Sequence, residues 1–398
     1  MAKIAILGLG TVGGGVAEVL RRNGASISDK LGEPLELSKI LVRHFRDNPW
    51  RSLMTDDFSQ IEEDPEIRVV VETIGGMEAA YGYTRRALEA GKHVVTANKE
   101  LVAEKGHELL ELARRNHVSY LFEASVGGGI PILRPLVQCM AANEIEEVYG
   151  ILNGTTNYIL TRMDRSGASF AGALKEAQEK GYAEADPTAD VEGLDTCRKI
   201  CILADLAFGR QILPAQVLTE GISALDLVDV KLAEANGWRV KLLGRCLRLP
   251  QGQRTAYVAP HLVREDSPIA SVEDVFNAIV VRGNATGEVM FYGKGAGDLP
   301  TASAVVADVI DALRHDKAPS PIGWSAGTEG VVSAEELKQR WYVRTEADQT
   351  AAEALLGPLE PLTDQTGLQA FLTQPLPLER LHRAETPLKM HSCLRVLT

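Results

Sequence analysis

The chain has 398 residues, of which 45% are hydrophobic and 24% are charged, so it can bury several cores and form two or three domains. Its formal net charge of −12 argues against a nucleic-acid partner, because phosphate binding needs clustered Lys and Arg. No export signal is visible and Asp205 interrupts the longest apolar run, so we expect a cytoplasmic protein that does not bind membranes.

The N-terminal third alternates short β-branched apolar runs with amphipathic stretches, which is the pattern of βαβ units that build a doubly wound parallel sheet. Glycines that could end helices stand at Gly24 and Gly91. After Pro131 the pattern predicts a helix through Met140, then a strand to residue 152 and a helix to residue 167. The expected strands of the parallel sheet cover residues 3–7, 37–43, 68–72, 93–96 and 118–122.

The second half reads as a mixture of helices and hairpins, which is typical of an α+β domain. The acidic loop GYAEADPTAD precedes a long apolar helix over 191–208, and 277–292 reads as a hairpin. The helix over 301–313 is apolar on nearly every face, so we expect it to pack back onto the N-terminal domain. In the tail, RWYVRTEA and RLHRAETPLKM look like strands on either side of a helix over 351–356.

The segment GLGTVGGG contains G-x-G-x-x-G directly between the first strand and a helix, as in a Rossmann-type dinucleotide site. Glycines there permit a sharp turn and a close approach of backbone N–H groups to a pyrophosphate, at the positive end of a helix. A tight turn without a ligand is the alternative. We predict cofactor contacts from Gly8, Gly10, Thr11, Val12 and Gly13.

The end of the second strand indicates which dinucleotide is bound. An acid there would bind the ribose 2′-hydroxyl of NAD, but the chain reads Val42, Arg43, His44. We therefore expect NADP, with Arg43 at its 2′-phosphate, although Asp47 lies near enough to keep NAD open. Arg43 could alternatively be a solvated strand end.

Carboxylates crowd the segment before and within the long apolar helix. Asp195 and Lys199 share one helix face at i, i+4, a spacing that is also common in surface ion pairs. The helix continues apolar, so we expect Lys199 at a domain junction, where a lowered pKa would suit a general acid or base. Cys197 and Cys201 on the same helix read as small hydrophobic residues rather than metal ligands. The acidic residues are Glu184, Asp186, Asp190, Glu192 and Asp195.

The spacing E-x-D-P-x-x-D-x-x-G-x-D-x-x-x-K resembles the signature of homoserine dehydrogenases. Further likeness lies in VTANKEL, FEASVGGGIP, ILNGTTNYIL and GKGAGDLPTASAVV, so the resemblance covers roughly residues 1–325. It implies an NADP- or NAD-dependent, reversible reduction of L-aspartate 4-semialdehyde to L-homoserine, in threonine, methionine and isoleucine biosynthesis.

The resemblance also implies residue roles. Lys199 would exchange the proton at the substrate oxygen, and Lys99 would act beside it near the nicotinamide, with Thr73 and Gly297 as further cofactor contacts. The homoserine amino and hydroxyl ends would be held by Glu184 and Asp195, with backbone from Gly181. Lys99 could instead be a surface lysine at a helix start, and Asp195 only an ion-pair partner.

In this family a monovalent cation, usually sodium, is held near the end of the fifth expected strand. The matching positions are Glu123 together with main-chain oxygens at Val126, Gly128 and Ile130. Glu123 could alternatively be an ordinary acid at a strand end.

The resemblance implies a homodimer or homotetramer, formed through the sheet of the middle domain. No kinase segment precedes the part that resembles a dehydrogenase, so we expect no fused aspartokinase. It also places a threonine-sensing ACT-type module after Gly330, but EADQTAAEA replaces the glycine-containing turn and fewer than 70 residues remain. We expect a short or diverged ACT-like region, with threonine inhibition left open. The expected domains are 1–135 plus about 300–325 for the dinucleotide, 136–299 for substrate and dimerisation, and 335–398 for the ACT-like part.

Two alternatives use the same residues differently. Another NAD(P)-dependent oxidoreductase, acting on a small amino or hydroxy acid, could use the same loop and lysines. A dinucleotide-sensing protein without catalysis would need no proton relay. A semialdehyde dehydrogenase that acylates a cysteine is disfavoured, because we expect Cys139 to lie within the apolar helix LVQCM.

Overall fold

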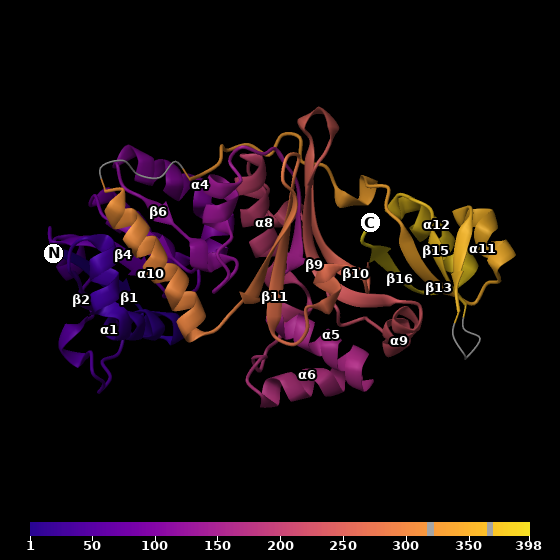
Figure 1. Cartoon of the computed structure of the whole chain (residues 1–398), viewed down its shortest axis with the longest axis horizontal. Coiled ribbons are helices and arrows are strands. Elements are labelled where there is room, and N and C mark those ends of the chain that lie inside the picture. The colour runs from indigo at the N-terminus through magenta and orange to yellow at the C-terminus, as the bar shows by residue number, and fades with distance from the viewer. Residues whose placement is uncertain (317–321, 364–368) are drawn as a thin grey trace. The chain divides into compact units, whose positions relative to one another are not determined.

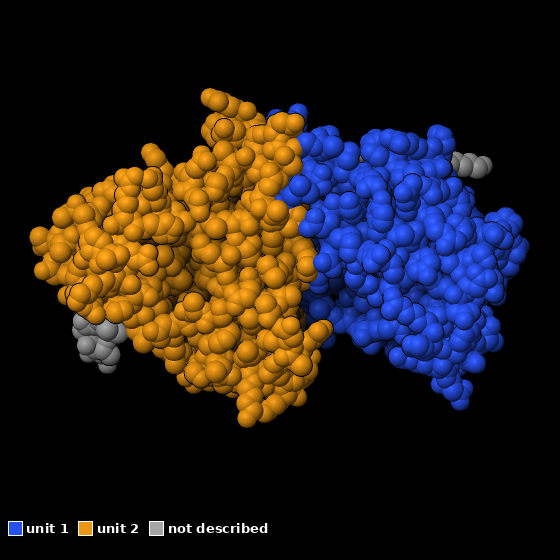
Figure 2. Space-filling model, turned by 180° about the vertical axis from the view of Figure 1, so that it is seen from behind, with its two compact units in different colours: residues 1–144, 202–213, 293–327 blue, residues 145–201, 214–292, 328–398 orange. Residues whose placement is uncertain are grey.

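A computed structural model describes residues 1–316, 322–363 and 369–398. The chain divides into two units, which are coloured separately in Figure 2. Unit 1 comprises residues 1–144, 202–213 and 293–327, and unit 2 comprises residues 145–201, 214–292 and 328–398. Among the described residues, every helix is too short or too polar to cross a bilayer.

Unit 1 is built around a six-stranded sheet whose order is β3-β2-β1-β4-β5-β6, and every pairing in it is parallel. This is the doubly wound order in which a dinucleotide binds where the strand order reverses. The sequence prediction of this sheet is confirmed, except that the two-residue β3 was too short to show a pattern. The strands are β1 (Ala2–Leu7), β2 (Leu35–Leu41), β3 (Met54–Thr55), β4 (Ile67–Glu72), β5 (His93–Thr96) and β6 (Tyr120–Leu121).

The longer helices of unit 1 cover the sheet, and Figure 1 shows the late helix α10 lying among the N-terminal elements. Val305 and Val309 of α10 share a core with Ile4 and Val71 of the sheet, so the expected packing of this helix is confirmed. The helices are α1 (Thr11–Leu31), α2 (Ser59–Glu62), α3 (Glu78–Glu89), α4 (Lys99–Arg115) and α10 (Asp298–Arg314).

Two glycines were expected to end helices, and one prediction was wrong. Gly91 follows α3 with a φ of +72°, as expected. Gly24 lies inside α1, which continues to Leu31 and ends at the left-handed Gly32. The cost of a glycine inside a helix, roughly 1 kcal/mol, is offset because α1 packs against the sheet and buries Ile27 in its last turns.

Unit 2 holds a ten-stranded sheet in the order β12-β11-β7-β9-β10-β16-β13-β15-β14, with β8 beside β10. The hairpin expected over 277–292 is confirmed, whereas the long strands β9 and β10 were missed because charged residues such as Lys241 and Arg245 are buried in them. The strands are β7 (Ile145–Ile151), β8 (Leu218–Thr219), β9 (Trp238–Arg248), β10 (Arg254–Arg264), β11 (Phe276–Gly283), β12 (Gly287–Lys294), β13 (Trp341–Thr345), β14 (Leu359–Leu362), β15 (Ala370–Thr373) and β16 (Met390–Val396).

The long apolar helix begins later than expected. Gly193, with a φ of +78°, separates α7 from α8, so the helix covers 194–208 instead of 191–208. Cys197 and Cys201 are buried in it, as expected. The first helices assigned to unit 2 are α5 (Gly154–Ser166), α6 (Phe170–Glu179), α7 (Thr188–Val191), α8 (Leu194–Phe208, whose last turns belong to unit 1) and α9 (Leu227–Ala235).

The C-terminal region forms a complete βαββαβ unit rather than a truncated one. It runs β13, α11 (Gln349–Leu356), β14, β15, α12 (Leu378–Leu388) and β16, and its strands pair in the order β16-β13-β15-β14. The prediction of a strand over RLHRAETPLKM was wrong: Leu378, Leu381, Ala384 and Leu388 follow a helical spacing and are buried, with Pro387 in the last turn of α12.

The helix expected through Met140 is a single π-helical turn over Pro135–Cys139, and Cys139 is exposed. The expectation that this cysteine lies inside an apolar helix is therefore wrong. Pro135 at the first position suits the start of the turn, since a proline has no N–H to leave unsatisfied there.

Candidate active site

The glycine-rich turn after β1 has the backbone that the motif predicts. Gly8 has a φ of +91°, and a Cβ on Gly13 would lie 2.0 Å from the carbonyl oxygen of Gly8. The Thr73 hydroxyl donates to the carbonyl of Leu7 at 2.9 Å, which ties the end of β4 to this turn. Gly10 is the N-cap of α1 and brings no side chain, so the N-terminal N–H groups of the helix face the turn.

A cavity of about 450 Å³ opens beside this turn within unit 1. Three basic residues and one acid line it, so its charge balance favours an anionic ligand. The acid is Asp56, not the Asp47 that the sequence suggested. The lining includes the predicted cofactor residues Gly8, Gly10, Arg43 and Thr73, and the charged residues are Arg43, His44, Arg46 and Asp56.

The N-terminus of α10 lies against the first turns of α1. A Cβ on Gly15 would lie 2.8 Å from the carbonyl oxygen of Asp298, which is the first residue of α10. Gly297, a predicted cofactor residue, is the N-cap of α10 with a φ of +119°. Gly15 was missed by the sequence analysis, although it is the last of the five glycines in GLGTVGGG.

Lys99 is the first residue of α4, directly after β5, and it is half-buried. The backbone around it is fixed by Asn98, whose side chain caps α4 and donates to the Gly76 carbonyl at 2.7 Å. The carboxylate of Glu72 accepts from the Thr96 hydroxyl at 2.6 Å, and burial raises the pKa of Glu72 above its ordinary value. Glu72 was also missed, because its partner Thr96 is contributed by the next strand. The Ile74 N–H donates to the other carboxylate oxygen at 2.7 Å.

Glu123 follows β6 and lies buried at the base of a glycine-rich loop. Its carboxylate accepts three backbone N–H groups, from Ile132 at 2.6 Å and from Leu133 and Arg134 at 2.8 Å each. Its own N–H donates to Asp308 at 2.8 Å, and burial raises the pKa of Asp308 to about 8. The side chain of Glu123 therefore shapes the loop.

The loop itself leaves no room for side chains. Gly128 has a φ of +55°, and a Cβ there would lie 2.3 Å from the carbonyl oxygen of Gly295. A Cβ on Gly127 would lie 2.5 Å from the Ile130 carbonyl oxygen. Gly127 and Gly128 can therefore offer a ligand only main-chain atoms, and a carbonyl oxygen is the kind of ligand that suits a hard cation.

In unit 2, Lys199 and Asp195 meet at the start of α8. Lys199 Nζ donates to Asp195 Oδ2 at 2.8 Å and to the Leu152 carbonyl at 2.7 Å. The two residues are 8% and 4% exposed, so the pair is no ordinary surface ion pair. Asn153 donates from one amide nitrogen to Asp195 at 2.9 Å and to Asp190 at 2.7 Å. We call Lys199, Asp195, Asn153 and Asp190 the Lys199 cluster.

The structure thus brings Lys199 and Asp195 together. The other two predicted substrate residues, Glu184 and Gly181, are exposed on the loop after α6, where the Gln178 side chain donates to the Glu184 carbonyl at 3.1 Å. Gly181 has a φ of +73°, which suits the turn that ends α6.

Asn153 was missed by the sequence analysis, although a signal was present. It is the N-cap of α5 and accepts from Thr156 N at 2.9 Å, as an Asn before a helical stretch predicts. Its contacts to Asp190 of α7 and Asp195 of α8 gave no such signal, because they join residues far apart in the chain.

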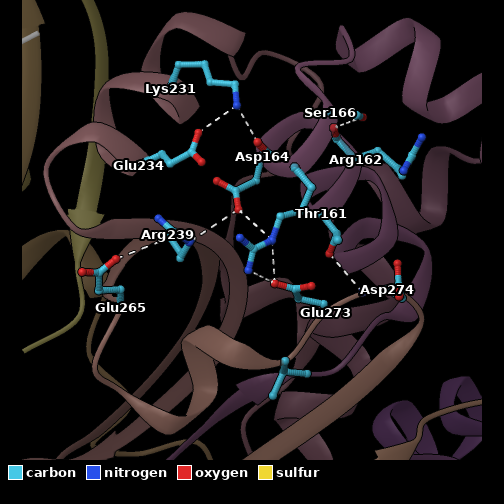
Figure 3. Close-up of polar contacts among 12 residues, drawn as sticks. Thr161, Arg162, Asp164, Ser166, Lys231, Glu234, Arg239, Glu265, Glu273 and Asp274 are labelled. Atoms are coloured by element: carbon cyan, nitrogen blue, oxygen red, sulfur yellow. Dashed lines mark hydrogen bonds and ion pairs between the residues drawn. The ribbon is translucent and has the colours of Figure 1, made fainter.

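A second polar cluster lies between α5, α9 and β9 of unit 2 (Figure 3). Asp164 is 3.4 Å from Arg239, and its carbonyl accepts from Lys231 at 2.5 Å. Nearby, Lys241 donates to the Val272 carbonyl at 2.6 Å, and burial lowers the pKa of Lys241 to about 8. We call Asp164, Arg165, Lys231, Arg239 and Lys241 the Asp164 cluster.

Two family models match the chain between residues 8 and 310. Residues 8–123 match the model described as "Homoserine dehydrogenase, NAD binding domain", and residues 131–310 match the model described as "Homoserine dehydrogenase".

Individual proteins agree with the family models. Homoserine dehydrogenase of Pseudomonas aeruginosa is 46% identical over 316 residues, which are 78% of this chain and 72% of that protein. That of Neisseria gonorrhoeae is 43% identical over 358 residues, or 86% and 81% of the two chains. A solved homoserine dehydrogenase from Thiobacillus denitrificans superposes with a TM-score of 0.91 at 36% identity, covering 100% of this chain and 98% of that one. A hyperthermophilic archaeal homoserine dehydrogenase, solved with NADPH, gives a TM-score of 0.65 at 28% identity, with 78% and 97% coverage.

Proposed function

We propose catalytic roles for two lysines in this chain, which belongs to the homoserine dehydrogenase family and is an NAD(P)-dependent oxidoreductase. Its reaction is the reversible reduction of L-aspartate 4-semialdehyde to L-homoserine. The main support for the proposal is the buried pair of Lys199 and Asp195, in which the carboxylate fixes the position of the Lys199 ammonium group.

Lys199 is the proton donor in the reductive direction. Asp195 and the Leu152 carbonyl fix its Nζ at 2.8 and 2.7 Å, so the ammonium is oriented before substrate binds. When bound, the dinucleotide supplies the hydride that adds to the aldehyde carbon. The carbonyl π electrons move to oxygen, and Lys199 gives that oxygen a proton. In oxidation Lys199 accepts the hydroxyl proton.

Lys99 stabilises the negative charge that develops on the same oxygen. Its place at the start of α4, next to the strand ends where a doubly wound sheet binds its ligands, supports this role. Asn98 and Thr96 hold the backbone there through hydrogen bonds of 2.7 and 2.9 Å.

The substrate's polar ends are bound by residues of unit 2. We assign the hydroxyl end to Asp195, which is buried beside Lys199, and the ammonium end to Glu184, with backbone from Gly181. Glu184 is exposed, which leaves its carboxylate accessible to a ligand. An ammonium on the substrate needs such a carboxylate when it leaves water.

The dinucleotide is held by the turn at Gly8, Gly10, Thr11, Val12 and Gly13, with Thr73 and Gly297 beside it, and NADP is preferred over NAD. Arg43, His44 and Arg46 line one cavity with a single acid, and this excess of basic groups suits a 2′-phosphate. Arg43→Ala should raise the KM for NADPH about tenfold while changing the KM for NADH much less. An equal change for both cofactors would remove Arg43 from this role.

A monovalent cation, for which sodium is the first choice, binds the loop after β6. Main-chain oxygens of Glu123, Val126, Gly128 and Ile130 would hold it, because the Glu123 carboxylate is committed to three backbone N–H groups. The loop glycines support a ligand set of this kind. Titrating sodium and potassium into protein freed of both ions, with turnover as the readout, tests this proposal.

The expectations of a homodimer or homotetramer and of a cytoplasmic location stay predictions. Light scattering on the purified chain measures the first directly.

The function is tested by Lys199→Ala, assayed for NADPH oxidation with aspartate semialdehyde. We expect robust turnover by the wild type and a loss of kcat of about 10²- to 10⁴-fold in the variant, with NADPH binding retained. Lys175→Ala, which removes an exposed lysine from the same unit, is the matched control and should behave as wild type. Wild-type turnover in the folded Lys199 variant would refute the role of Lys199.

A further inference from the structure

The C-terminal strand β16 is tied to the segment that supports the start of α8. Arg395 of β16 donates from Nη1 to Glu220 Oε2 at 2.5 Å. Glu220 directly follows β8, and its N–H donates to the Val258 carbonyl of β10 at 2.8 Å. We infer that Glu220 and Arg395 are positioning residues for Lys199, an inference that rests on the proposed role of that lysine.

Arg395 is held rigidly inside the sheet. It is 1% exposed, and its guanidinium lies between the rings of Trp341 and Tyr257, at 4.8 and 5.2 Å from their centroids. Glu220 is 41% exposed on its side chain, so in this pair the buried arginine fixes the place of the glutamate.

The segment that follows Glu220 touches the backbone of α7 without intervening side chains. Ile222 N donates to the Val191 carbonyl at 2.8 Å. A Cβ on Gly221 would lie 2.3 Å from that same carbonyl oxygen and 2.5 Å from the Cα of Glu192. A displacement of Gly221 must therefore displace the end of α7.

The end of α7 leads within two residues to the Lys199 cluster. Gly193 turns the chain with a φ of +78°, and its carbonyl accepts from Cys197 N at 2.8 Å in the first turn of α8. Asp190 of α7 and Asp195 of α8 share the amide of Asn153. The corner between α7 and α8 is thus held from one side by Asn153 and from the other by the segment that Glu220 anchors.

The ring contacts and the ion pair use only part of the buried guanidinium of Arg395. Among the described residues, Nε and Nη2 of Arg395 have no hydrogen-bond partner, which is costly in the interior of a protein. An apolar side chain of similar volume would avoid that cost. A role in placing Glu220 accounts for the guanidinium, because only a donor can hold the carboxylate.

The test compares Arg395→Met and Glu220→Ala with the wild type. Both should lower kcat for semialdehyde reduction about 3- to 30-fold, while the melting temperature of Arg395→Met stays equal or rises and the Kd of NADPH stays unchanged. Glu220→Gln, which keeps an acceptor oxygen, should recover most of the kcat that Glu220→Ala loses. The double variant should lose no more than either single variant, since both break one contact.

The pair Arg340–Glu360, with 2.8 Å between its charged atoms, belongs to the same C-terminal region, so Glu360→Ala is the matched control and should keep wild-type kcat. If Glu220→Ala and Arg395→Met both keep wild-type kcat while Lys199→Ala is inactive, this inference is overturned and the proposed function stands. An active Lys199→Ala variant would instead remove the proposed function. If Arg395→Met fails to fold, the two Glu220 variants decide.

Discussion

Unit 2 contains two buried acid–lysine clusters that differ in how the chain holds them. In the Lys199 cluster, the partners of the lysine lie at ends of elements: Asn153 caps α5, Asp190 lies in the single turn of α7, and Asp195 lies in the first turn of α8, one turn before Lys199. In the Asp164 cluster, Asp164 in the last turns of α5 lies beside Arg239 of the long strand β9 (Figure 3). Lys241 belongs to the same strand.

A shifted pKa does not by itself identify a catalytic lysine. Lys241 has a pKa lowered by burial to about 8, which is the property expected of a general base. Yet its Nζ donates to the Val272 carbonyl, and the residue lies in the middle of the long strand β9. Lys199 is similarly buried, but it follows the corner at Gly193, where two chain segments meet and where binding sites commonly lie.

The largest expected difference between the clusters is in catalysis. Asp195→Asn keeps the shape but removes the charge that orients Lys199, so kcat should fall about 10³-fold, which corresponds to about 4 kcal/mol. Asp164→Asn, the same change in the other cluster, should leave kcat within about twofold. Steady-state kinetics with both variants, after circular dichroism has shown that they fold, measure this difference. A comparable loss in both variants would break the distinction.

The second difference is in the dependence of stability on pH. The folded chain releases the Lys241 proton near pH 8, whereas the unfolded chain keeps it until about the ordinary value of 10.5. The free energy of unfolding should therefore rise as the pH increases from about 8 to 10, by up to about 3 kcal/mol. Lys241→Met should abolish this rise and keep activity, whereas Lys175→Met, at an exposed lysine, should retain it. Urea unfolding at both pH values is the measurement, and a rise that persists in Lys241→Met contradicts the assignment.

Local patterns predicted two parts of the candidate active site: the glycine-rich turn and the pair of Asp195 and Lys199. The turn at Gly8 and Gly13 could be read because its constraints lie within a few residues. Asp195 and Lys199 could be paired because one helical turn separates them.

Contacts between distant segments could not be read in this way. Asn153 and Asp195 are 42 positions apart, and Arg395 and Glu220 are 175 apart, so no periodicity links them. The strands β9 and β10 were missed for a related reason. Arg245 of β9 is buried because it pairs with Glu147 on another strand. From the sequence alone this partner is unknown, so a charged residue in a strand is predicted to be exposed.

Asn153 links the Lys199 cluster to the cap of α5, so its removal should have intermediate effects on both the free energy of unfolding and kcat. Asn153→Ala should lower the free energy of unfolding by about 1 kcal/mol through the lost cap, and lower kcat about tenfold through the lost contacts to Asp190 and Asp195. Ser169→Ala removes a comparable cap, which accepts from Gly172 at 3.2 Å, and should cost stability without changing kcat. Equal kcat in both variants would mean that Asn153 only caps.

The smallest expected effect lies at the exposed edge of the Asp164 cluster. Arg165 is 50% exposed on its side chain and pairs with Glu273, with 2.8 Å between Nε and the carboxylate, so water screens much of the attraction. Arg165→Ala should lower the free energy of unfolding by about 0.5 kcal/mol and leave kcat unchanged. High salt should shrink that small loss further.

The less exposed Arg239, 17% exposed and 3.4 Å from Asp164, should lower the free energy of unfolding by more when it is changed to Ala, because its removal leaves a buried carboxylate without that neighbouring charge. Denaturant unfolding of the two variants at low and high salt therefore separates the exposed edge of the cluster from its interior, and equal losses at both arginines would show that burial does not divide the cluster in this way.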